Sequence, residues 1–173
     1  MLREYQKEDF PQMRKWVNDP EVVQYLSDIF LFPHTENNTE AFLNSVLLGN
    51  EKDNAHFIIA DKTTETYLGQ VDLIYIDWKN RVAEIGIVIG SEENRGRGIG
   101  TEALKILQSF VFESLNLNRL EIKVRDFNAR AIRCYLKSGF LEEGRLRQNF
   151  FVKGKYRDTI CLAMLQSEYK KTK

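Results

Sequence analysis

The chain has 173 residues, 43% of them hydrophobic and 29% charged, and its formal net charge is zero. This composition predicts a single globular domain over residues 1–173 with a substantial core. Because no apolar run is long enough to cross a membrane and no signal peptide is evident, we expect a cytoplasmic protein without a membrane partner. Cys134 and Cys161 make no disulfide framework. His34 and His56 lack metal-ligand spacing, so no metal site is expected.

Charge is unevenly distributed along the chain. Residues 19–61 contain eight acids and one base, whereas residues 95–157 contain fourteen Lys and Arg against six Asp and Glu. A basic half suits an anionic ligand and an acidic half a cationic partner, although solvated faces and helix caps explain most acids individually. Nucleic-acid binding would require bases interleaved with aromatics on one face, and zero net charge gives it no support, so no nucleic-acid partner is expected.

Hydrophobic periodicity and breaker residues predict alternating helices and strands. Short helices are expected after Asp9 and at residues 22–26, followed by an irregular loop over residues 27–38. A third helix, capped by Thr39, should end at Gly49. Strands are expected at residues 1–5, 57–60, 67–76, 82–89, 119–125, 145–152 and 158–164, and a helix at residues 101–117. This arrangement predicts an α/β or α+β layered domain.

A loop rich in glycine and arginine lies between the strand ending near residue 90 and the helix that follows. It reads Arg95-Gly96-Arg97-Gly98-Ile99-Gly100-Thr101. Glycines let the backbone approach a ligand, and the first N–H groups of a helix lie unpaired at the positive end of its dipole. The loop therefore predicts an anion cradle suited to a pyrophosphate, with added arginine donors. It lacks the Lys-Ser or Lys-Thr pair of a Walker A loop and has Thr101 where a dinucleotide fingerprint needs glycine.

A second informative segment covers residues 128–140. Asn128 is a natural N-cap and Gly139 a natural residue to follow the C-terminus, so one short helix is predicted between them. Asn128 and Tyr135 are seven residues, or two turns, apart and share a face of this helix.

Together the two segments resemble the GNAT superfamily of N-acetyltransferases. Arg95-x-x-Gly98-x-Gly100 matches the acetyl-CoA pyrophosphate loop [RQ]-x-x-G-x-[GA], and residues 128–140 match N-x-x-A-x-x-x-Y-x-x-x-G-F at every defined position. The order and separation of the motifs make the resemblance specific, and it covers nearly the whole chain. It implies acetyl-CoA as cofactor and a GNAT fold: a mixed sheet of about seven strands that splays between strands 4 and 5, with helices on both faces.

The resemblance also implies roles for individual residues. Tyr135 would protonate the departing thiolate, and Asn128 would bond the pantetheine region. Backbone groups of Ile87 and Ile89 would bind the cofactor at a distortion of the strand, for which Gly86 is suited. The expected cofactor contacts are Ile87, Val88, Ile89, Arg95, Gly96, Arg97, Gly98, Ile99, Gly100, Thr101, Asn128 and Tyr135.

Glu84 is the leading candidate for the base that deprotonates the amine. Strand alternation places it opposite Ile85 and Ile87, and a carboxylate in a partly apolar cleft can accept a proton directly or through water. The alternative is a solvated or paired strand charge. Asp72 is the second candidate, either as base or to orient a cationic substrate. Further acids expected at the substrate are Asp28, Glu36 and Glu40.

Two subfamilies resemble the chain closely and leave the amine open. Residues 16–22 resemble the ribosomal-protein N-terminal (Rim-type) acetyltransferases, whereas residues 142–157 and 165–169 resemble the spermidine/spermine N-acetyltransferases. The bacterial spermidine enzymes carry a denser acidic cluster, which binds polyamine allosterically and accompanies a large oligomer. Residues 30–40 contain only two acids, which argues against that allosteric site and against a dodecamer.

We therefore expect an N-acetyltransferase that transfers acetyl from acetyl-CoA to a primary amine by direct attack in a ternary complex. Cys134 is not expected to carry the acetyl group, because neighbours in a helix point about 100° apart. The expected acceptors are a polyamine or diamine first, a peptide N-terminus second and an aminoglycoside or amino sugar third. A non-catalytic acyl-CoA-binding module would keep the loop but need not keep Tyr135. The expected partners are the small-molecule amine and further copies of the chain, in a homodimer or higher homo-oligomer.

Overall fold

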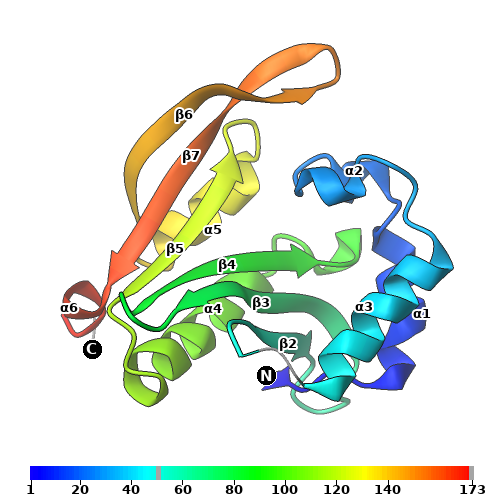
Figure 1. The fold of residues 1–173 in the computed structure, drawn as a ribbon, viewed down its shortest axis with the longest axis horizontal. Coiled ribbons are helices and arrows are strands. Elements are labelled where there is room, and N and C mark those ends of the chain that lie inside the picture. Colours follow the sequence, from blue (N-terminus) through cyan, green and yellow to red (C-terminus); the bar gives the residue numbers. More distant parts are fainter. Residues whose placement is uncertain (50–51, 172–173) are drawn as a thin grey trace.

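A computed structural model describes residues 1–49 and 52–171 (Figure 1). Its strands form a seven-stranded mixed sheet in the order β1-β2-β3-β4-β5-β7-β6. They are β1 (Leu2–Arg3), β2 (Ala55–Ala60), β3 (Tyr67–Asp77), β4 (Val82–Ile89), β5 (Arg119–Arg125), β6 (Leu141–Val152) and β7 (Lys155–Leu165). The helices are α1 (Phe10–Trp16), α2 (Pro20–Val23), α3 (Glu36–Leu48), α4 (Ile99–Ser109), α5 (Ala129–Lys137) and α6 (Gln166–Tyr169).

The two faces of β4 contact different helical layers. Ile85 packs in the main core with Leu104 and Leu107 of α4. Val88 packs on the opposite face against Trp16 at the end of α1. Because side chains alternate along a strand, Glu84 lies on the face of Val88 and away from α4, as expected.

The neighbouring strands β4 and β5 are parallel but pair over only three positions. The register ends where Glu84 faces Glu121, although β4 continues to Ile89 and β5 to Arg125. Figure 1 shows the two strands diverging beyond this point. The expected splay between strands 4 and 5 is therefore confirmed.

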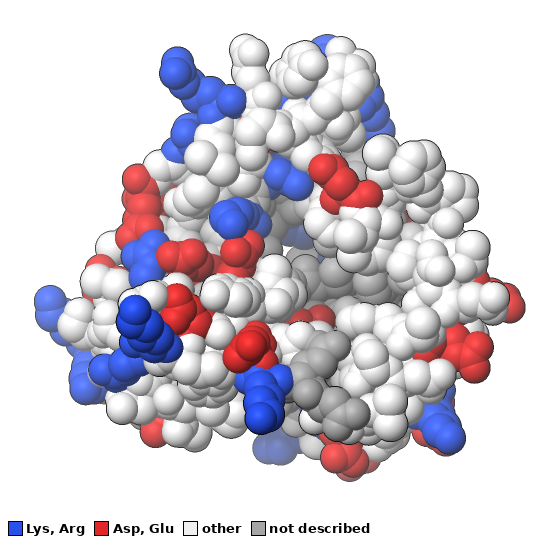
Figure 2. Space-filling model, in the orientation of Figure 1, with Lys and Arg blue, Asp and Glu red and all other residues white. Residues whose placement is uncertain are grey.

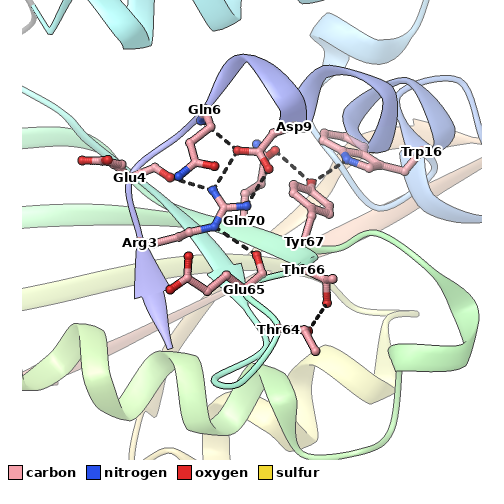
Figure 3. Close-up of polar contacts among 10 residues, drawn as sticks. All are labelled: Arg3, Glu4, Gln6, Asp9, Trp16, Thr64, Glu65, Thr66, Tyr67 and Gln70. Carbon is pink, nitrogen blue, oxygen red and sulfur yellow. Dashed lines mark hydrogen bonds and ion pairs between the residues drawn. The ribbon is translucent and has the colours of Figure 1, made fainter.

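Buried polar contacts join the first helical layer to the edge of the sheet (Figure 3). Arg3 donates to both carboxylate oxygens of Asp9, at 2.9 and 2.6 Å, and both side chains are nearly inaccessible to water. The indole of Trp16 donates to the hydroxyl of Tyr67 at 2.9 Å, and that hydroxyl donates to the amide oxygen of Gln70 at 3.3 Å. These bonds hold α1 against β1 and β3, which fixes the layer next to Val88.

The start of α3 differs from the expectation. Its cap is Thr35, whose hydroxyl accepts the N–H of Asn38, and the expected cap Thr39 is buried within the helix. Both threonines have a hydroxyl that can cap, so local spacing cannot distinguish them. Arg14 of α1 decides the choice, because it donates to the Thr39 hydroxyl at 2.9 Å and thereby holds Thr39 against the neighbouring helix.

Other element boundaries also differ from the predicted ones. The loop predicted over residues 27–38 contains a 3-10 turn at Asp28–Phe30. The helix predicted over residues 101–117 begins at Ile99, ends at Ser109 and continues as a π-helical turn over Phe110–Ser114. The last two strands are longer than predicted, and α6 was not predicted at all.

We predict that Gly69→Ala destabilises the protein. A Cβ at Gly69 of β3 would lie 2.2 Å from the carbonyl oxygen of Val88, so the backbone of β3 or β4 would have to move. We expect a loss of about 2–4 kcal/mol in the free energy of unfolding, measured by urea denaturation. Gly144→Ala on β6 is the control, because its Cβ would meet nothing within 4 Å. Equal stability of the two variants would contradict the close approach of β3 and β4.

Candidate active site

The loop before α4 has the backbone geometry of an anion cradle. Gly96 and Gly98 have positive φ angles of 78° and 85°, and a Cβ at either would meet nothing within 4 Å. Glycine is therefore required for the conformation of the loop, and the space beside it is open. Gly98 caps α4 without a side chain, so the N–H groups of Ile99, Gly100 and Thr101 have no acceptor within the helix. These donors at the positive end of α4 fit the pyrophosphate of CoA.

The two arginines of the loop have different surroundings. Arg95 donates to the carbonyl oxygens of Ile89 and Gly90, both at 3.4 Å, which ties the loop to the end of β4. Arg97 is exposed and makes no ion pair or hydrogen bond with any residue that the structure describes. Arg97 is thus the arginine whose guanidinium is available to a phosphate, whereas Arg95 also anchors the loop.

Backbone groups along the open edge of β4 can bind a ligand. The N–H of Gly90 donates to the carbonyl of Leu68 in β3 at 3.1 Å. N–H groups alternate in direction along a strand. The N–H of Val88, two residues before Gly90, therefore also points toward β3. The N–H groups of Ile87 and Ile89 point the other way, toward the gap beside β5. The expected donors Ile87 and Ile89 therefore face the place where the strands part.

The distortion expected at Gly86 lies in the neighbouring strand instead. Gly86 pairs regularly with Asp72, and the register shift falls in β3 between Leu73 and Tyr75, where Ile74 is the extra residue. A Cβ at Gly86 would lie 3.2 Å from Ile74 Cγ2, so the glycine makes room for this bulge. Gly86 predicted a distortion in β4, but the distortion lies in the part of β3 that pairs with this region of β4.

Helix α5 brings the second motif to the same region. Gly100 at the start of α4 packs on Cys134, since a Cβ there would lie 3.3 Å from the Cys134 Sγ. Thr101 Oγ1 lies 3.4 Å from the same sulfur. Cys134 therefore joins the first turn of α4 to α5. Asn128 caps α5, accepting the Ala131 N–H at 3.2 Å, so its expected role as an N-cap is observed.

Tyr135 is buried in the main core, with its ring 6.4 Å from that of Phe140 in an edge-on contact. Within the described part of the chain, its hydroxyl makes no hydrogen bond. Burial raises the pKa of Tyr135 far above its usual value, so the phenol stays protonated at neutral pH. The Tyr135 hydroxyl therefore carries a proton that it does not donate to any described residue.

Glu84 lies at the point where β4 and β5 begin to part, and it is one half of an ion pair. Lys123 Nζ on β5 donates to Glu84 Oε2 at 2.9 Å. The side chains are 48% and 25% exposed, respectively. The hydrogen bond to Glu84 raises the pKa of Lys123, so this lysine is an ammonium at neutral pH. Of the two roles considered for Glu84, the structure shows the paired strand charge.

Asp72 is enclosed between the sheet and the first helical layer. Its carboxylate accepts from the Tyr5 hydroxyl at 3.2 Å and the Phe57 N–H at 3.3 Å, and it lies 3.1 Å from His56 Nδ1. Burial, followed by the charge of Asp72, raises the pKa of Tyr5 well above its usual value. Asp72 therefore belongs to a buried network of the N-terminal layer.

The remaining predicted acids do not converge on one point. Asp28 is exposed in the 3-10 turn after α2 and acts electrostatically on Arg125 at the tip of β5. Glu36 and Glu40 are exposed on α3, which packs against α1 at the far side of the first layer (Figure 1). Of these acids, only Asp28 lies near the parted strands.

Charged residues on the exposed face of β5 were not predicted from the sequence as part of the site. Arg125 lies over the ring of Phe150, 3.6 Å from its centroid, and donates to Thr159 Oγ1 at 2.6 Å. Lys123 lies on the same face as Arg125. The alternation of charged and apolar residues along β5 was the available signal, since it places these charges together. Figure 2 shows a hollow in the middle of this view, with charged side chains gathered beside it.

Comparison with known proteins decides the family. The profile of the acetyltransferase (GNAT) domain matches residues 1–141. The chain belongs to the GNAT acetyltransferases. It is thus an acetyl-CoA-dependent acyltransferase. The backbone groups of the loop before α4 and of the open edge of β4 fit the cofactor.

Individual relatives support this assignment. An N-acetyltransferase called p20 from Bacillus licheniformis is 32% identical over 170 residues, which are 97% of this chain and 93% of that one. Spermidine N(1)-acetyltransferase of Escherichia coli K12 is 40% identical over 101 residues, covering 58% of this acetyltransferase and 54% of the relative. The solved spermidine N-acetyltransferase of Vibrio cholerae with CoA and spermine has a TM-score of 0.86 and 27% identity, covering 98% of this chain and 97% of that chain.

Residues 1–49 and 52–171 contain neither a candidate metal-ion cluster nor a candidate membrane-spanning helix. No group of three or more His, Cys, Asp or Glu side chains there is placed to hold a metal ion. Within the same residues, no helix has both the length and the apolar character to span a membrane.

We predict that Arg97→Glu weakens binding of acetyl-CoA. Reversing the charge of a guanidinium available to phosphate should raise the dissociation constant about tenfold or more, measured by isothermal titration calorimetry. Lys79→Glu is the control, because it makes the same charge change in the turn at the opposite end of β4. An unaltered dissociation constant for Arg97→Glu would refute the phosphate assignment of the loop.

Proposed function

We propose that this acetyltransferase transfers the acetyl group directly from acetyl-CoA to a small primary amine, a polyamine or diamine such as spermidine or spermine. One observation carries the proposal: Glu84 presents a carboxylate where the strands begin to part, and this carboxylate is already paired with the ammonium of Lys123. A position that holds one ammonium suits the ammonium of an acceptor. Glu84 lies on the face of the sheet away from α4 and α5. On the opposite face, the packed side chains of these helices block access of an amine to the gap.

Each residue of the site would perform a different step of the acetyl transfer. The N–H groups of Ile87 and Ile89 face the gap and would polarise the thioester carbonyl. Glu84 would take one proton from the acceptor's ammonium, which frees the nitrogen lone pair for attack, and the second proton would leave to solvent as the amide forms. As the carbon–sulfur bond breaks, Tyr135 would give its proton to the thiolate. These groups come from β4 and α5, so a bound amine and thioester would meet between them and transfer can be direct.

Two observations bear on the identity of the acceptor. Similarity to the spermidine N-acetyltransferases favours a polyamine, and Asp28, which acts electrostatically on Arg125 of β5, adds a second acid to Glu84. Arg125 adds a positive charge there, which a polycation would have to avoid. A peptide N-terminus is the second candidate and an aminoglycoside or amino sugar the third. Assembly as a homodimer or higher homo-oligomer, and a cytoplasmic location, belong to the same proposal.

A panel of amines tests the acceptor. We expect saturable thiol release from acetyl-CoA with spermidine, spermine and putrescine, and little with Ser/Ala N-terminal peptides or an aminoglycoside. Turnover with peptides alone would replace the polyamine by a protein N-terminus. If no amine supports thiol release, the proposed transfer reaction is wrong for this chain.

Tyr135→Phe tests the proton donor. Since the pKa of Tyr135 is raised, the phenol keeps its proton throughout the neutral range, and wild-type kcat should not fall between pH 7 and pH 9 through loss of that proton. We expect Tyr135→Phe to lower kcat about a hundredfold, with unchanged affinity for acetyl-CoA. The control is Tyr156→Phe on the exposed β6–β7 hairpin. Equal kcat values for the two variants would remove Tyr135 from the mechanism.

A further inference from the structure

We propose that Lys123 is a specificity-determining residue of the acceptor site: its ammonium occupies the place at the Glu84 carboxylate that the ammonium of the acceptor must take. This inference rests on the proposed function and adds to it how the site discriminates among amines. Lys123 would act as a resident competitor, so that an acceptor binds by displacing it.

The position of Lys123 supports this role. It lies two residues beyond Glu121, the last residue of β5 that pairs with β4, and therefore beside the gap between the strands. Its side chain reaches back across that gap to Glu84 at 2.9 Å. Among the ion pairs of residues 1–49 and 52–171, it is the one that joins β4 to β5.

The contact can exchange partners. Both side chains are partly exposed, 48% for Lys123 and 25% for Glu84, and water competes for ion pairs at such sites. A buried pair would resist displacement because a separated partner would lose its compensation inside the protein. An entering ammonium can therefore replace that of Lys123, which can turn into solvent on its four-carbon stem.

Lys123 is also the residue whose positive charge compensates the Glu84 carboxylate. The nearby Glu121 is already paired with Arg119, which also binds Glu143, so that arginine does not neutralise Glu84. The hydrogen bond to Glu84 raises the pKa of Lys123, so the lysine competes for the carboxylate as an ammonium. Removing the lysine should leave an unoccupied carboxylate and favour cationic acceptors.

Steady-state kinetics of Lys123→Met test the inference. KM and kcat are measured with spermidine, or with a Ser/Ala peptide if that is the amine the wild type acetylates. We expect the acceptor KM to fall about three- to tenfold, while the KM for acetyl-CoA stays unchanged. Lys123→Arg keeps a cation at Glu84 and should restore the wild-type KM. Lys62→Met removes an equal charge from the exposed β2–β3 turn and should change neither constant.

The outcomes separate this inference from the proposed function. An acceptor KM that is unchanged or raised in Lys123→Met, in an enzyme with wild-type turnover of acetyl-CoA, would overturn the role of Lys123 alone. A wild type that acetylates no amine would overturn the proposed function and this inference with it. If Lys123→Met lacks a cooperative thermal unfolding transition, Lys123→Gln replaces it, since the amide keeps a polar group at the exposed position while removing the charge.

Discussion

The parting of β4 and β5 after Glu84 and Glu121 is the constraint on which the rest of the site depends. Each strand keeps its other neighbour along its length: β4 pairs with β3 as far as Ile89, and β5 pairs with β7 as far as Arg125. The strands can therefore separate without losing the sheet. Backbone groups on the inner edges are left without a ladder partner, and such groups require another partner when water is excluded. A ligand lying in the gap can supply it.

The two helices behind the sheet make this gap usable. The N-terminus of α4 stands beside it because Gly98 allows the left-handed turn that starts the helix. Gly100 allows close contact with Cys134, so α5 approaches α4 and carries Tyr135 into the main core. The proposed anion site and the proposed proton donor thus depend on one helix–helix contact between small side chains. A larger residue at position 100 would separate the two functions in space.

The acidic residues show why charge patterns are harder to interpret than motifs. Asp72 and Glu84 are both acids in adjacent strands, yet Asp72 is buried among Tyr5, Phe57 and His56 while Glu84 opens to solvent beside Lys123. Alternation along each strand predicts the face on which an acid lies. It does not predict which residues from distant segments cover it. The acidic half of the chain is accordingly spread over separate surfaces, and only part of it lies near the opening.

The sequence by itself determined the family, the conformation of the glycine-rich loop before α4 and the helix carrying Tyr135. These features depend on residues that are close together in the sequence: glycine at positive φ, free N–H groups at the start of a helix, and the cap at Asn128. It also placed Glu84 on the correct face. Only the tertiary structure decided that Thr35 rather than Thr39 caps α3, that the bulge lies in β3 and that Glu84 is paired with Lys123. Each of these depends on a partner from another segment, and a contact between segments is set by how they pack rather than by the order of residues within either one.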